Sequence, residues 1–394
     1  MTSIRRGIAA IAAFTFLAAA CGSDDDASET ASETASADAD ASDTASASDS
    51  ASASDSASAS EPAGSDSSSA SDSASASEPA DDAVEDEDAM EDDATTDDSS
   101  SDCSGTYSFE SYSGAVEVPR NPENIAVLDL AMLASFDELG IPIDENDGFA
   151  SLGTPVPAEY EELVNTPKSL GTIFEPDLEA LNAMEPDLIV VAARSSRGYG
   201  DLVDLDIAPV VDLTQFDAAG TDYFEEFARN HRNIGEIFCV QDEVEAALGE
   251  LQSTIDAVAA AAPEAGDALV LVTTGAEVTA FGPGAFRFGQ VYDTYGFTAA
   301  DDSLARDETH GDPVSFEFIA EAQPELLFVV DRAGAIGEEG QSAEAILDNA
   351  LVDATPAGQN DKIFYVDSFD WYIVFNGIPG VRGVAEDLSA ALGS

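Results

Sequence analysis

Basic residues are scarce in this chain of 394 residues: 13 lysines and arginines stand against 80 aspartates and glutamates, for a formal net charge of −67. No lysine or arginine occurs between Arg6 and Arg120, and the only lysines are Lys168 and Lys362. A negative charge of this size repels phosphate groups, which disfavours nucleic acids and anionic lipid surfaces as partners. We therefore expect no nucleic-acid partner.

Catalytic and metal-binding patterns are also missing. The sequence contains three cysteines and two histidines, His231 and His310, and they form no cluster with zinc-ligand spacing. It has no P-loop, no Gly-x-Ser-x-Gly elbow and no evident pair of nucleophile and base. These absences predict a protein that is not an enzyme and that carries no intrinsic cofactor.

Only the N-terminus carries an apolar stretch with the layout of an export signal. Arg5 and Arg6 precede the apolar residues 8–17, and three alanines follow directly before Cys21. The run Leu17-Ala-Ala-Ala-Cys21 resembles the bacterial lipobox. It implies a lipoprotein signal peptide at residues 1–20 and a lipidated Cys21 that anchors the protein to the outer face of the cell membrane. The alternative is plain secretion with an unmodified thiol. No later segment approaches the roughly 20 apolar residues of a membrane span, so we expect a lipid anchor as the only membrane attachment.

Residues 21–104 have the composition of a disordered linker. Near-repeats of Ser, Ala, Asp and Glu fill this segment, which has too few apolar residues to offset the entropy of an ordered chain. Cys103 at its end and Cys239 are the two remaining cysteines. In an exported protein such a pair predicts a disulfide, with two free thiols as the alternative.

The rest of the chain alternates short apolar strands with helices, which predicts an α/β fold of two Rossmann-like lobes with parallel sheets. Five apolar residues at helical spacing predict one long helix over Asp242–Ala262, long enough at about 1.5 Å per residue to join the lobes. We place the N-terminal lobe at 105–240, the interlobe helix at 241–265 and the C-terminal lobe at 266–394. The predicted strands are Asn124–Leu130, Pro186–Val191, Ile207–Leu213, Ala268–Thr273, Leu326–Val330 and Lys362–Val366.

An internal repeat supports two lobes of similar build. Residues 178–194 (LEALNAMEPDLIVVAAR) align without a gap on residues 316–332 (FEFIAEAQPELLFVVDR), and both end on an arginine. Ligands of parallel sheets bind beyond the carboxyl ends of the strands. Arg194 and Arg332 should therefore face each other across one cleft as ligands for anionic oxygen, although two surface ion pairs would also explain them.

Four further polar residues are candidates for the cleft or its rim. Glu179 and Glu317 open the two repeated helices, where the helix dipole alone could account for them. His310 lies in a predicted loop, and Tyr372 follows the last strand; a structural role is the ordinary explanation for both. His231, in a polar run on a helix, is predicted to be solvated.

Several segments then carry a family resemblance. From Tyr107 onward the chain resembles the binding proteins for iron siderophores and cobalamin, whose two lobes are joined by one long helix, and within them the catecholate-siderophore group of petrobactin- and enterobactin-type receptors. The matching segments include Asn121-Pro, Leu170-Gly-Thr, Phe281-Gly-Pro-Gly, Arg287-Phe-Gly, Thr309-His-Gly, Phe328-Val-Val-Asp-Arg332, Trp371-Tyr372 and Asn376-Gly377.

The resemblance assigns roles to seven residues. It implies that Arg194, Arg287 and Arg332 hold catecholate oxygens, and that His310 and Tyr372 complete the iron shell of a tetradentate siderophore. It also implies that Glu179 and Glu317 dock on arginines of a membrane permease. The expected protein is a monomeric, extracytoplasmic solute-binding lipoprotein that delivers Fe(III), bound as a siderophore complex, to an ABC importer. Haem or cobalamin as cargo and a cell-surface interaction protein stay open as alternatives.

Overall fold

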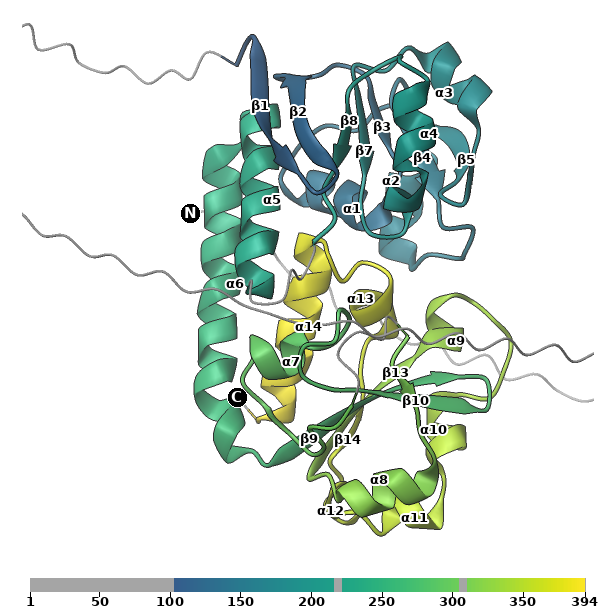
Figure 1. Cartoon of the computed structure of the whole chain (residues 1–394), viewed down its shortest axis with the longest axis vertical. Coiled ribbons are helices and arrows are strands. Elements are labelled where there is room, and N and C mark those ends of the chain that lie inside the picture. Colours follow the sequence, from purple (N-terminus) through teal and green to yellow (C-terminus); the bar gives the residue numbers. More distant parts are fainter. Residues whose placement is uncertain (1–102, 216–221, 305–309, 394) are drawn as a thin grey trace, which may run out of the picture. The chain divides into compact units, whose positions relative to one another are not determined.

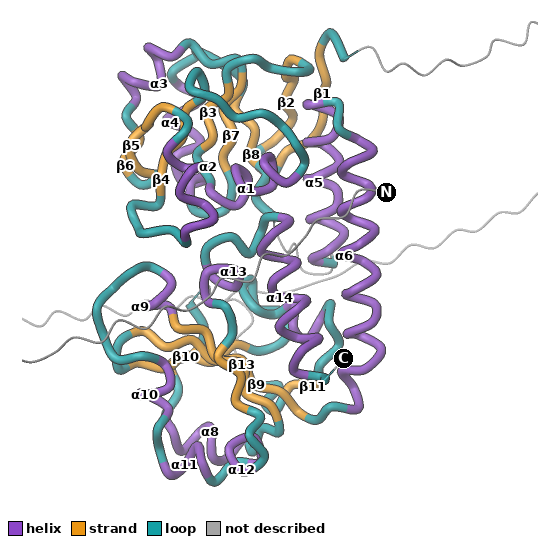
Figure 2. The backbone as a smooth tube through the Cα atoms, turned by 180° about the vertical axis from the view of Figure 1, so that it is seen from behind, coloured by secondary structure: helices purple, strands orange, loops and turns teal. Residues whose placement is uncertain are grey.

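The computed structural model describes residues 103–215, 222–304 and 310–393. The predicted signal peptide, Cys21 and nearly all of the predicted linker lie outside the described residues. Within them, two six-stranded sheets form separate lobes, and a long helix runs beside both (Figures 1 and 2). The predicted α/β fold with two parallel-sheet lobes is confirmed.

The N-terminal lobe is built on the sheet order β6-β5-β4-β3-β7-β8, in which only β6 runs antiparallel to its neighbour. A separate hairpin, β1–β2, precedes it. The strands are β1 (Thr106–Ser111), β2 (Gly114–Pro119), β3 (Ile125–Val127), β4 (Gly148–Ser151), β5 (Lys168–Thr172), β6 (Glu175–Pro176), β7 (Leu188–Val191) and β8 (Val210–Asp212). The helices are α1 (Leu130–Glu138), η1 (Ala158–Tyr160), α2 (Glu161–Asn165), α3 (Leu178–Met184), η2 (Ser195–Gly198), α4 (Tyr199–Asp204) and α5 (Tyr223–Phe238).

The C-terminal lobe has the sheet order β12-β10-β9-β13-β14, with β11 also pairing with β9. Its central strands are parallel, whereas β10 is antiparallel to both β9 and β12. The strands are β9 (Asp267–Thr274), β10 (Glu277–Phe281), β11 (Thr298–Ala299), β12 (Asp312–Pro313), β13 (Leu326–Asp331) and β14 (Ile363–Tyr365). The helices are η3 (Ala262–Glu264), α7 (Gln290–Asp293), α8 (Phe316–Ala322), α9 (Arg332–Ala335), α10 (Ala343–Leu347), α11 (Ala350–Asp353), α12 (Pro356–Gln359), α13 (Ser368–Tyr372) and α14 (Ile378–Ala391).

The linking helix α6 spans Gln241–Ala261 and buries the five apolar residues whose spacing predicted it. The C-terminal helix α14 packs against both α6 and α1. One apolar cluster therefore continues from α1 and α5 through α6 and α14 to β9 and β13. None of the described helices is long and apolar enough to cross a bilayer.

The two copies of the repeat have equivalent local structure. Asp177 and Ser315 occupy matching positions and cap α3 and α8 by accepting a backbone N–H. Both helices end on a left-handed residue, Glu185 and Gln323, directly before the repeated proline. The same sequence pattern thus produces the same helix, turn and strand in each lobe.

Cys103 and Cys239 form a disulfide in the structure, with Cα atoms 5.9 Å apart. Cys239 ends α5 in a left-handed conformation, so the bridge ties the start of the folded region to the end of that helix.

The prediction for His231 is wrong. Its side chain is fully buried between α5 and α1, with Nδ1 2.9 Å from the Phe227 carbonyl oxygen and Nε2 3.2 Å from Ser135 Oγ. Burial lowers the pKa of His231 to about 4, although the contact with Phe227 acts in the opposite direction. The inner face of α5 also buries Asn230 and Asn233. Polar residues on this helix therefore do not identify its exposed face.

Candidate functional site

The structure brings the strand-end arginines of both lobes to the same place. Arg194 follows β7 in a tight turn, where Ser195 Oγ accepts the N–H of Ala192 at 3.0 Å. Arg332 opens α9 directly after β13, where Asp331 caps the helix by accepting the N–H of Gly334 at 2.9 Å. Both short turns follow fully buried strands, which fixes the backbone from which each guanidinium projects.

Tyr372, at the end of α13, is the common neighbour of these arginines. Arg332 Nε donates to the Tyr372 hydroxyl at 3.0 Å. The guanidinium carbons of Arg194, Arg287 and Arg332 lie 5.1, 4.8 and 5.8 Å from the centre of the Tyr372 ring. Arg194 and Arg287 also lie within 6.0 Å of the Phe375 ring centre. Cations at these distances are attracted to the electron-rich ring faces.

Carboxylate partners are nearly absent from this cluster. Among the described residues, Arg194 and Arg287 form no ion pair, and Arg332 reaches only Glu338, at 4.0 Å. Within the part of the chain that the structure describes, Arg287 Nε is buried without a hydrogen-bond partner. In a chain with 80 acidic residues, three arginines therefore converge with little anionic compensation.

The charges act on one another's ionisation. Burial lowers the pKa of Arg194 to about 10, and the neighbouring charge of Arg287 acts in the same direction. Burial alone would raise the pKa of Tyr372, but the charges of Arg287 and Arg194 and the hydrogen bond from Arg332 outweigh it and lower that pKa. The site thus makes Tyr372 easier to deprotonate than an ordinary tyrosine.

Asp129 is a site residue to which the sequence analysis gave no role. It caps α1 at the carboxyl end of β3 and is only 5% exposed. Burial raises its pKa to about 6, while hydrogen bonding and the charge of Arg194 oppose the rise. The sequence signal that could have pointed to Asp129 is its place between a buried strand and a helix, in Leu128-Asp129-Leu130.

Tyr372 begins a segment that we call the strap (residues 372–378), which joins α13 to α14 and attaches to the N-terminal lobe. Five hydrogen bonds join its backbone to N-terminal side chains: Arg194 Nη2 to Tyr372 O (2.6 Å), Arg194 Nη1 to Ile373 O (3.5 Å), Tyr223 Oη to Phe375 O (2.8 Å), Gln215 Nε2 to Asn376 O (3.4 Å) and Ile378 N to Ser135 Oγ (2.9 Å). Gly377 permits the close approach, since a Cβ there would lie 2.4 Å from Ala131 O. The strap therefore holds Tyr372 against Arg194, although the tyrosine follows the sheet of the other lobe.

His310 lies on an exposed turn before β12. Gly311 fixes the end of this turn, with φ +73° and with room for no side chain beside Phe281. No hydrogen bond or ring contact among the described residues joins His310 to Tyr372, and residues 305–309 before it are outside the described part. Its role as an iron ligand stays a prediction.

Glu179 and Glu317 are both exposed, near the start of α3 and α8. Figures 1 and 2 show these two helices at opposite ends of the described fold, away from α13. The role of the two glutamates at the rim of the cleft stays a prediction. A partner that contacts both would have to span both lobes.

Comparisons with known proteins agree with this architecture. The sequence pattern of the periplasmic binding proteins matches residues 125–368. The petrobactin-binding protein YclQ of Bacillus subtilis is 31% identical over 279 residues, which cover 70% of this chain and 84% of that protein. Its crystal structure superposes with a TM-score of 0.66 over 74% of this chain and 99% of that chain.

Two further solved structures are similar over the same region. The catecholate-siderophore binding protein VctP of Vibrio cholerae is 29% identical, with a TM-score of 0.66 over 73% of this chain and 100% of that chain. The iron uptake ABC transporter substrate-binding protein PiuA of Streptococcus pneumoniae is 32% identical, with a TM-score of 0.65 over 73% of this chain and 99% of that chain.

We expect Tyr372 to ionise at a lower pH than an ordinary tyrosine. A titration of tyrosinate absorbance should show one phenol that ionises early, because positive charge stabilises the phenolate. Tyr372→Phe should remove this phase, and Arg287→Ala should move it to higher pH. An early phase that persists in Tyr372→Phe would show that another tyrosine produces it.

Proposed function

Because this chain belongs to the periplasmic binding protein family, we propose that it binds a ferric siderophore of the catecholate or mixed type outside the cytoplasm and delivers it to the permease of an ABC importer. The observation that carries the proposal is the cluster of Arg194, Arg287 and Arg332 around Tyr372 with almost no carboxylate partner. The names of the similar proteins supply the class of cargo, since they bind petrobactin and other siderophores or take up iron.

The chemistry of the cluster suits such a cargo. A ferric catecholate complex carries several negative oxygens, and guanidinium groups offer fixed planar donors to them. Fe(III) is a hard ion that takes phenolate oxygen readily, and its charge further lowers the pKa of a coordinating group. The aromatic rings of Tyr372 and Phe375 offer flat surfaces beside the charges.

Arg287→Ala should weaken the binding of a ferric catecholate siderophore by more than tenfold, because it removes one charge without a protein counterion. Quenching of the buried Trp371 gives the affinity. Arg197→Ala, at an exposed arginine three residues after Arg194, is the matched control and should bind like the wild-type protein. Equal affinities of Arg287→Ala and wild type would refute the proposed site.

We also propose that Tyr372 and His310 fill the two iron positions that a tetradentate siderophore leaves open. His310→Ala should then shift the visible charge-transfer band of a tetradentate ferric complex and leave that of a hexadentate complex unchanged. The same spectrum for wild type and variant with the tetradentate complex would exclude His310 as a ligand.

Delivery requires a membrane attachment and a docking surface. We propose that a signal peptide directs export and that a lipidated Cys21 anchors the chain, with residues 22–102 as a spacer and the disulfide of Cys103 and Cys239 closing the folded region. In the chain-entropy view, a bridge across 136 residues contributes about 5 kcal/mol. The intact mass of the protein recovered from membranes tests the removal of the signal peptide and the lipidation of Cys21.

Glu179 and Glu317 are the proposed contacts with the permease. Replacing both by alanine should leave siderophore affinity unchanged and abolish iron uptake by cells, because both side chains are exposed and belong to α3 and α8, which lie away from α13. Uptake at the wild-type rate would show that docking uses other residues.

A further inference from the structure

The strap crosses the N-terminal lobe beside the arginine cluster. Its anchors Gln215 and Tyr223 follow β8 and open α5, and Ser135 of α1 holds its other end. In the strand order β4-β3-β7-β8, Arg194 follows β7. A ligand that contacts Arg194 and is larger than the cluster can extend toward the ends of β3 and β4.

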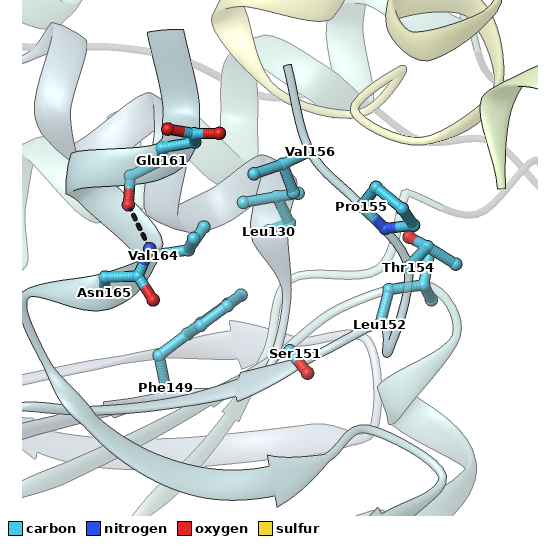
Figure 3. A pocket seen from close by; sticks show the side chains of 10 residues that line it. All are labelled: Leu130, Phe149, Ser151, Leu152, Thr154, Pro155, Val156, Glu161, Val164 and Asn165. Atoms are coloured by element: carbon cyan, nitrogen blue, oxygen red, sulfur yellow. Dashed lines mark hydrogen bonds between the residues drawn. The ribbon is translucent and has the colours of Figure 1, made fainter. Parts of the chain in front are cut away.

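A hollow of about 460 Å³ lies at the ends of those two strands. Six of its ten lining residues are apolar, and Figure 3 shows Phe149 and Val164 pointing toward Leu130 and Val156. The carboxylate of Glu161 lies at its upper edge in that view. Water in an apolar hollow is easily displaced by an apolar group, whereas a carboxylate beside Glu161 would be repelled.

The hollow is within reach of a ligand held by the arginines. Leu130 in its wall directly follows Asp129, and the carboxylate of Asp129 interacts electrostatically with Arg194. The end of β4 is two strand spacings from the end of β7, about 10 Å at roughly 4.8 Å per spacing.

Contacts between the lobes lie beside the hollow. Pro155, in its wall, packs against Gly337, which follows α9 in the C-terminal lobe; a Cβ on Gly337 would lie 2.7 Å from Pro155 Cδ. Tyr160, directly before α2, packs with its ring tilted against that of Phe369 of α13, with the ring centres 5.2 Å apart. The hollow therefore lies beside contacts between the two lobes, at the carboxyl end of the sheet that Arg194 follows.

We propose that this hollow is a specificity subsite that receives an apolar arm of the bound siderophore and that Glu161 disfavours an arm ending in a carboxylate. The proposal rests on the proposed function, because the arginine cluster holds the ferric centre of the same ligand. In this proposal, the N-terminal lobe binds the part of the siderophore that lies outside its iron-binding groups.

The test uses three synthetic ferric bis-catecholates that share one linker. One has no side arm, one carries a pendant n-butyl chain and one carries a pendant carboxyethyl chain. Wild-type protein should bind the butyl compound about tenfold more tightly than the plain one, from partial burial of four carbons. The carboxyethyl compound should bind more weakly than the butyl compound.

Val156→Phe should remove the preference for butyl by filling the hollow, while affinity for the plain compound stays at the wild-type value. Val164→Phe fills the hollow from the opposite wall and serves as the second variant should the first one unfold. Val203→Phe is the matched control, because Val203 is an exposed valine in a different hollow beside the start of β8, and it should keep the preference. Glu161→Gln should improve binding of the carboxyethyl compound alone.

The outcomes separate the two proposals. Equal wild-type affinities for the plain and butyl compounds, or a butyl preference that survives both filling variants, would overturn the subsite and leave the siderophore site standing. Failure of wild-type protein to bind any of the three compounds would overturn the proposed function and the subsite with it.

Discussion

Three guanidinium groups lie around the ring of Tyr372. The site depends on how the repulsion between these positive charges is balanced. The lowered pKa of Arg194 reflects that repulsion and the loss of hydration. The protein supplies ring faces, the Tyr372 hydroxyl and main-chain carbonyl oxygens, which offset part of the charge. Buried cations are stable when a counterion is close, and here the described residues provide almost none. In the proposed function, an anionic ligand would complete this balance.

The strap determines how lobe motion can affect this cluster. Tyr372 belongs to the C-terminal lobe by sequence, yet the backbone after it is held by Arg194, Tyr223 and Gln215 of the other lobe. Arg287 and Arg332 belong to loop and helix segments of the C-terminal lobe, so a lobe displacement would move them relative to Tyr372 more than it moves Arg194. The apolar cluster that continues through α6 and α14 opposes large displacements. We infer that ligand binding adjusts distances within the cluster rather than closing a wide cleft.

The repeat made much of this predictable. Local signals alone fix the helix, the turn and the buried strand that precede Arg194 and Arg332, and the helical spacing from Val244 to Val258 gave α6. Arg287 has no counterpart in the other copy and lies in a loop, so only the family resemblance pointed to it. The strap contacts join residues more than 150 positions apart through backbone carbonyls, which carry no sequence signature. His231 was misjudged because its polar helix face meets polar partners inside the protein, Ser135 and the Phe227 carbonyl.

An acidic protein that binds an anion needs its positive charge to be local. The net charge of −67 would repel a ferric catecholate at long range, but screening at physiological salt confines each exposed charge to about 8 Å. The arginine cluster is partly buried and is screened less than the exterior. Much of the excess charge also belongs to residues 21–104, which contain no basic residue. Attraction therefore begins only when the ligand reaches the cleft, where the guanidinium groups, the aromatic rings and the strap are already in place.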